Sequence, residues 1–282
     1  MKVGLIVIDG QKDFVEGGNL AVTGGNKALS NVAKMIKRVK GDLFSIDCTM
    51  DAHHRHHIGH SRMWVNAKGE NPPPYITQMK PADVIGTGAI WRAANIAWQA
   101  RQQKYIEDLS KRNDQRESLG LLRIDHTIWT DHCLIGTDGM SLQADLYAAI
   151  CEWEDLKNRP ANKTTKGSFI FAEHFSVFKA EVPDPSEPST DVNMSLITEL
   201  NKLDMLAWCG LAEDYCLMNS FIDFILQLSG NDPTTAKNIA KKMIFLEDGT
   251  AAVGAVPALK QTFHDFLSKW GVSVETTDSF LK

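Results

Sequence analysis

The sequence lacks long apolar runs and an excess of positive charge, and each absence excludes a class of function. No apolar stretch approaches the ~20 residues that a helix needs to cross a bilayer. The apolar segment near the N-terminus is too short for a signal peptide and ends at Asp9. The 282 residues carry a formal net charge of −5, whereas nucleic acids and anionic membranes are bound by basic surfaces. We therefore expect a cytoplasmic protein that binds neither nucleic acid nor membrane.

Paired cysteine motifs are also absent. The five cysteines are an odd number without a CxxC spacing: Cys48, Cys133, Cys151, Cys209 and Cys216. In a reducing compartment the expected state is free thiols, most of them small buried apolar side chains. Each thiol therefore has to be judged from its local sequence.

Buried strands alternate with helical segments along most of the chain. Strands are expected at Lys2–Ile8 and Gly41–Asp47, and strand–helix pairs at LDMLAWCG with CLMNSFIDFILQL and at KMIFLEDG with ALKQTFHDFLSKW. A last short strand is expected in GVSVETTDSF. This alternation predicts an α/β fold with an open, mostly parallel sheet and helices on both faces.

One region, at about 61–125, interrupts the alternation. It contains NPPPY and then apolar residues that recur at roughly helical spacing: Trp91, Ala94, Trp98, Tyr105 and Leu109. We expect an inserted loop and an amphipathic helix within a single domain that spans 1–282. In the simpler interpretation the apolar stripe packs on its own domain. In the alternative it faces a sister subunit, and a homo-oligomer is expected.

Cys216 is the cysteine whose surroundings suggest chemistry. It follows a predicted strand, Asp204–Trp208, and the turn GLAED, and it opens a helix with an apolar stripe. A thiol at a helix N-terminus feels the positive end of the helix dipole, which favours a lowered pKa. The unpaired N–H groups there can hold an oxyanion. A half-buried structural cysteine is the alternative for Cys216, and a small buried thiol is the natural interpretation of Cys209.

Asp9 lies at the carboxyl end of the first strand, where doubly wound sheets bind ligands. A partly desolvated carboxylate at this position can act as a general base. The alternative is an aspartate that forms a turn before Gly10.

Histidines cluster after the second strand, in DAHHRHHIGH. Asp51 and His53 are two residues apart, so an extended segment presents their oxygen and nitrogen ligands on one side, as suits Zn²⁺ or a similar ion. Surface histidine tracts also occur without a metal, so the hypothesis needs a distant ligand. The segment IWTDHCLIGTDG offers His132.

Five segments, in this order, resemble the nicotinamidase/isochorismatase family of cysteine hydrolases: IVIDGQKDFVEGGNLAVTGG, DAHHRHHIGHS, WTDHCLIGTDG, TKGSFIFAEHFS and GLAEDYC. The resemblance implies a three-layer α/β/α fold with a mostly parallel, Rossmann-like six-stranded sheet. It also implies that Asp9 is the general base, that Lys166 is the family's lysine and that Cys216 is the nucleophile. A cis peptide bond before Ala212 is implied too, with the N–H groups of Ala212 and Cys216 forming an oxyanion hole.

The resemblance further implies a metal site with three protein ligands, Asp51, His53 and His132. Zinc is the first expectation for the ion, with iron and manganese as alternatives, and His57 or His60 is a candidate further ligand. Two aromatic residues, Phe14 and Trp129, correspond to the walls that nicotinamidases place around a pyridine ring. Ordinary core packing is the alternative for these two.

The chemistry implied is hydrolysis of nicotinamide to nicotinate and ammonia through a cysteine thioester, a reaction of NAD salvage. Glu213 departs from the family's usual threonine, and the stretch from His53 to His132 is longer than in compact members. Another small amide or carbamoyl compound is therefore an alternative substrate. A catalytically silent binding protein is an alternative of a different class. Isochorismate hydrolysis is less favoured, because the chain has both the cysteine and the Asp-x-His pair.

Overall fold

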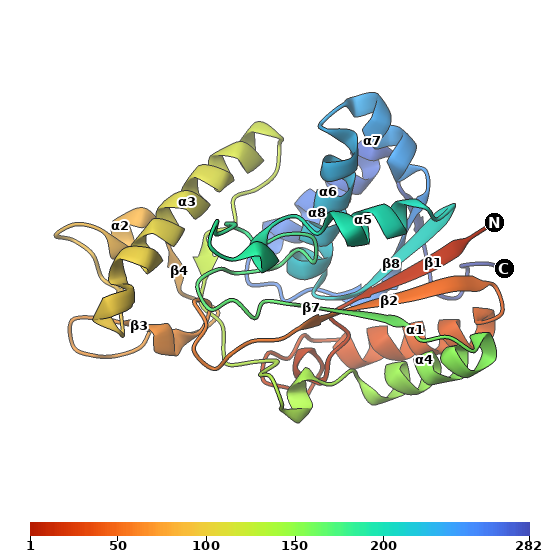
Figure 1. The fold of residues 1–282 in the computed structure, drawn as a ribbon, viewed down its shortest axis with the longest axis horizontal. Coiled ribbons are helices and arrows are strands. Elements are labelled where there is room, and N and C mark those ends of the chain that lie inside the picture. The colour runs from red at the N-terminus through yellow and green to blue at the C-terminus, as the bar shows by residue number, and fades with distance from the viewer.

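A central six-stranded sheet organises the computed structural model, which describes residues 1–282 (Figure 1). All neighbouring strands are parallel, in the order β10-β9-β8-β1-β2-β7. Their bounds are Val3–Ile8 (β1), Leu43–Asp51 (β2), Asn162–Lys166 (β7), Met205–Leu211 (β8), Met243–Ala251 (β9) and Ser273–Glu275 (β10). None of the helices combines the length and the apolarity needed to span a membrane.

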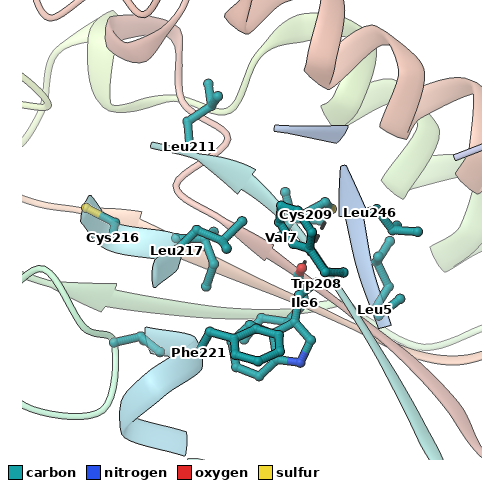
Figure 2. Packing of buried hydrophobic residues seen from close by; sticks show 14 of the residues in the cluster. Leu5, Ile6, Val7, Trp208, Cys209, Leu211, Cys216, Leu217, Phe221 and Leu246 are labelled. Atoms are coloured by element: carbon teal, nitrogen blue, oxygen red, sulfur yellow. Dashed lines mark hydrogen bonds between the residues drawn. The ribbon is translucent and has the colours of Figure 1, made fainter. Parts of the chain in front are cut away.

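Helices cover both faces of the sheet, which confirms the predicted three-layer α/β/α architecture. Figure 1 shows α1 and α4 on one face, and α5, α6, α7 and α8 on the other. Their bounds are Gly25–Val39 (α1), Ala144–Lys157 (α4), Met194–Asn201 (α5), Met218–Ser229 (α6), Pro233–Ala240 (α7) and Pro257–Trp270 (α8). Between sheet and helices lies a cluster of 61 buried apolar residues. Figure 2 shows part of it, with Trp208 of β8 and Phe221 of α6 packed together at 4.9 Å between ring centroids.

Two strands are longer than the sequence predicted. β2 continues to Asp51, where the prediction ended it at Asp47, and β8 continues to Leu211, where the prediction ended it at Trp208. Pairing with neighbours explains both extensions, because Asp51 is in register with Lys166 of β7 and Gly210 with Ile8 of β1.

The inserted region contains short elements and one long helix, α3. Their bounds are Trp64–Val65 (β3), Gln78–Met79 (β4), Pro81–Val84 (α2), Arg92–Ala93 (β5), Gln99–Ser118 (α3) and His126–Thr127 (β6). Of the predicted helical stripe only Tyr105 and Leu109 lie on α3. Placing the other three there was wrong, because Asn95 caps a 3₁₀ turn, Ile96–Trp98, just before the helix. Tyr105 and Leu109 are buried in a second cluster of 11 apolar residues within the same chain. The single-domain division stays a prediction.

His126 packs against two members of this second cluster and makes stability depend on pH. The ring is buried, and its Nε2 lies 3.0 Å from the Ile58 carbonyl oxygen. It packs edge-on against Tyr105 and at a tilt against Trp64. Burial lowers the pKa of His126 to about 4, whereas a histidine in the unfolded chain has a pKa of about 6.5. The unfolded chain therefore binds the proton first. The buried, neutral His126 therefore contributes fully to the stability of the fold above pH ~6.5, and this contribution declines as the pH falls toward 4.

We expect His126→Gln, which keeps a donor for Ile58, to lose less stability than the wild type when the pH falls from 7.5 to 5. The difference between the two losses should be about 2 kcal/mol in urea unfolding. Equal losses in both proteins would contradict the prediction.

Candidate active site

Four side chains from different strands meet at the carboxyl edge of the sheet. Asp9 follows β1, Asp51 ends β2, Lys166 ends β7, and Cys216 comes five residues after β8. These strands are neighbours in the sheet, in the order β8-β1-β2-β7, so their carboxyl ends lie side by side. Oxygens of Asp9 and Asp51 and the sulfur of Cys216 lie within 4.8 Å of one another.

Lys166 is the centre of this arrangement. Its Nζ donates to Asp51 Oδ1 at 2.6 Å and to the His174 carbonyl at 2.9 Å. It also lies 2.9 Å from Asp9 Oδ2 and 3.6 Å from Cys216 Sγ. Burial alone would lower the pKa of this ammonium, but the charges of Asp51 and Asp9 outweigh burial and raise the pKa well above its usual range. Lys166 therefore stays charged, with both carboxylates as counter-ions.

Asp9 is fully buried and has a left-handed backbone, with φ of 45°. Thr49 holds it from β2: the Asp9 N–H donates to Thr49 Oγ1 at 3.0 Å, and that hydroxyl donates to Asp9 Oδ1 at 2.5 Å. Burial raises the pKa of the carboxyl, although the charge of Lys166 acts in the other direction. A carboxylate with a raised pKa is a better proton acceptor than an exposed one.

Cys216 lies in a π-helical turn, Glu213–Leu217, directly before α6. Figure 2 shows its sulfur at the edge of the drawn residues, pointing away from the other labelled side chains, whereas Cys209 lies among them, as predicted for a structural cysteine. The expected lowering of the thiol pKa was wrong. Burial raises the pKa of Cys216 well above its usual range, and the nearby charge of Lys166 offsets this only in part. The resting thiol is therefore protonated.

The turn that carries Cys216 is held at several points. The Leu211–Ala212 peptide bond is cis, as the resemblance implied. The Ala212 carbonyl accepts the N–H groups of Tyr215 and Leu217 at 3.2 and 3.1 Å. The oxyanion-hole role of Ala212 and Cys216 stays a prediction.

Glu213, which the sequence resemblance singled out as unusual, connects the same turn to α8. Its carboxylate is buried and lies 2.7 Å from His264 Nε2 and 3.1 Å from Lys260 Nζ. These contacts tie the first residue of the turn to α8.

Asp51, His53 and His132 form a compact cluster that fits a metal ion. Asp51 Oδ2 lies 3.4 Å from His53 Nε2 and 3.8 Å from His132 Nε2. Each ring is oriented through Nδ1, His53 by the Gly167 carbonyl at 2.9 Å and His132 by that of Thr130 at 2.8 Å. Nδ1 can donate there, which leaves Nε2 as a ligand. His53 Nε2 is buried without a hydrogen-bond partner, as expected for a metal-binding atom.

The hydrogen bonds of the two rings also distinguish between His57 and His60 as candidates for a further metal ligand. His57 uses both nitrogens, because Nδ1 accepts the Gly59 N–H at 3.3 Å and Nε2 lies 3.1 Å from the Ala172 carbonyl. His60 is oriented by Nδ1 toward the Arg55 carbonyl, and its Nε2 is buried without a partner. Its ring centroid lies 5.3 Å from that of His132. His60 is therefore the better candidate for a fourth ligand.

A small cavity opens onto both the thiol and the metal cluster. Eleven residues line it: Phe14, Leu20, Asp51, Trp129, His132, Glu173, Phe175, Ala212, Tyr215, Cys216 and Val253. Both predicted aromatic residues are among them, with Phe14 5.4 Å from His132 and Trp129 5.0 Å from Tyr215 between ring centroids. The sequence interpretation missed Glu173, Phe175 and Tyr215, although Glu173 and Phe175 lie in the quoted segment TKGSFIFAEHFS and Tyr215 precedes the thiol.

No family model and no curated protein sequence matches the chain, but solved structures do. A nicotinamidase/pyrazinamidase from Acinetobacter baumanii is 17% identical with a TM-score of 0.61, over 99% of this chain and 98% of the other. The yeast nicotinamidase bound to the inhibitor nicotinaldehyde is 18% identical with a TM-score of 0.59, over 97% and 99%. The Pyrococcus horikoshii pyrazinamidase in complex with zinc is 17% identical with a TM-score of 0.55, over 98% and 99%. The chain therefore has the fold of these proteins, as the resemblance implied.

Proposed function

We propose that this chain is an amidohydrolase that converts nicotinamide to nicotinate and ammonia. One observation carries the proposal: a thiol that lines a cavity with aromatic walls lies against a buried carboxylate and ammonium, beside residues that fit a metal ion. Structures of the same fold support it, since the yeast nicotinamidase binds nicotinaldehyde in one of them.

In the first half of the reaction Asp9 accepts the Cys216 proton as the sulfur attacks the amide carbonyl carbon. Burial raises the pKa of both groups, so the proton moves only when a bond to carbon replaces the S–H bond. The Lys166 ammonium, 3.6 Å from the sulfur, stabilises negative charge as it develops. The carbonyl oxygen, now an oxyanion, accepts hydrogen bonds from the N–H groups of Ala212 and Cys216.

Collapse of this intermediate breaks the C–N bond, and Asp9 returns the proton to the departing ammonia. A thioester between Cys216 and the nicotinoyl group remains. Asp9 then takes a proton from a water molecule that attacks the thioester carbonyl, and the released thiolate regains the proton. The products are nicotinate and the free thiol.

Asp51, His53 and His132 hold the metal ion in this proposal, with His60 as the fourth ligand. Zinc is the proposed ion because carboxylate and imidazole ligands suit it and because the P. horikoshii pyrazinamidase is a zinc complex. When bound, the ion supplies a Lewis acid at the end of the cavity that the aromatic residues enclose.

Ammonia release from a panel of amides tests the proposal. We expect the zinc-loaded protein to prefer nicotinamide and pyrazinamide over a carbamoyl amino acid by at least about tenfold in kcat/KM. A preference for the carbamoyl compound would keep the amidase chemistry and replace the substrate. No ammonia from any amide would favour the silent binding protein.

A further inference from the structure

Glu173 is a buried carboxylate without a counter-ion. The residue is 5% exposed. Its Oε1 accepts the N–H of the next residue, His174, at 3.2 Å, and its Oε2 is buried without any hydrogen-bond partner. The carboxylate makes no ion pair with a lysine, arginine or histidine within 4.0 Å. A buried carboxylate is costly when it is ionised and unpaired, so this group is suited to a position beside a cation.

The carboxylate belongs to the cavity that the metal cluster borders. Glu173 lines the same cavity as Asp51 and His132. Its Oε2 lies so close to Gly59 that a Cβ built there would be 2.4 Å from that oxygen and 3.4 Å from Trp129 Cδ1.

The backbone of Glu173 is fixed from two sides. Its N–H donates to the Tyr105 hydroxyl of α3 at 3.2 Å, and its carbonyl accepts the Glu181 N–H at 2.8 Å. The side chain is therefore presented to the cavity from a restrained segment, as a positioned polar group should be.

The ammonium of the site is already paired. Lys166 lies 2.9 Å from Asp9 and 2.6 Å from Asp51, and no cationic side chain lies within 4.0 Å of the Glu173 carboxylate. A metal ion held by Asp51, His53 and His132 is therefore the cation that Glu173 can accompany.

We propose that Glu173 is the outer anionic partner of the metal centre, where it accepts a hydrogen bond from water bound to the ion. The inference rests on the metal site of the proposed function, but not on the identity of the amide. Carboxylates at such positions typically change metal affinity by 10–100-fold when they are replaced.

Zinc affinity of Glu173→Gln tests the inference, with Glu181→Gln as a matched control. Glu181 is a buried carboxylate eight positions further on that pairs with Arg112. In competition with a chromophoric chelator at pH 7.5, we expect Glu173→Gln to bind Zn²⁺ about 10–100-fold more weakly than the wild type. Glu181→Gln should bind within about twofold of it. Glu173→Asp keeps the charge and should lose less than Glu173→Gln.

Thermal unfolding gives a second readout. Without metal, Glu173→Gln should be at least as stable as the wild type, because an uncompensated charge is gone, and its Tm should rise less on addition of zinc. Wild-type affinity and a wild-type Tm rise in Glu173→Gln would overturn the inference and leave the metal site intact. No zinc binding by the wild type would overturn both. Loss of ammonia release with unchanged zinc affinity would count against the inference as well.

Discussion

Cys216→Ala is expected to lose at least about four orders of magnitude in kcat, while it stays folded and binds metal like the wild type. The reason is geometric: this sulfur lies 3.6 Å from the Lys166 ammonium and within 4.8 Å of the oxygens of Asp9 and Asp51. Without it no thioester can form. The metal ligands do not include the thiol, so metal content should not change. Ammonia release, metal analysis and the intact mass of rapidly quenched enzyme measure the three effects.

Cys209→Ala is the matched control. Cys209 lies on β8, seven residues before Cys216, and is fully buried, with its thiol 3.7 Å from the Ile6 carbonyl. We expect a loss of about 1 kcal/mol in stability from the core, with turnover and the acyl adduct retained. Substantial turnover in Cys216→Ala would exclude the thioester route.

Parallel-strand topology explains why so much of the site could be predicted from the sequence. Each predicted group ends or follows a strand, and the carboxyl ends of neighbouring parallel strands meet at one edge. Asp9 and Cys216 were therefore recognisable from position and chemistry. Lys166 was not, because a lysine before a glycine has no local signature. Its role depends on register, since Asp51 and Lys166 are paired residues of β2 and β7.

Burial and hydrogen bonding in the folded chain explain the site properties that could not be predicted from the sequence. The helix position of Cys216 favoured a lowered thiol pKa, but desolvation outweighs that effect in the folded chain. Likewise, only the hydrogen bonds at each ring nitrogen separate His60 from His57. Glu173 resembles any surface glutamate in sequence, and its significance arises from the absence of a partner in the folded state.

Lys166→Met is expected to lower the free energy of unfolding by about 3–5 kcal/mol and to abolish most turnover. The ammonium is the common counter-ion of two buried carboxylates, at 2.6 Å from Asp51 and 2.9 Å from Asp9. Its removal leaves Asp9 without a counter-ion and Asp51 with only the imidazoles of His53 and His132 nearby, so burial raises the pKa values of these carboxyls. The penalty should therefore be largest at pH 7.5 and shrink as the pH falls and the carboxylates bind protons. Urea unfolding at pH 7.5 and 5, with a chelator present, measures it.

Two further variants separate charge from packing in this prediction. Lys163→Met removes a lysine of the same strand that pairs with Glu154 at 3.1 Å and has a side chain 37% exposed. It should change stability by no more than about 0.5 kcal/mol. Adding Asp9→Asn to Lys166→Met removes the charge of a buried carboxylate that has lost its counter-ion. The double variant should therefore be more stable than Lys166→Met at pH 7.5. It should still be inactive, because the proton acceptor is gone. If the double variant were less stable than Lys166→Met, packing around the lysine stem, rather than its charge, would hold the strand ends together.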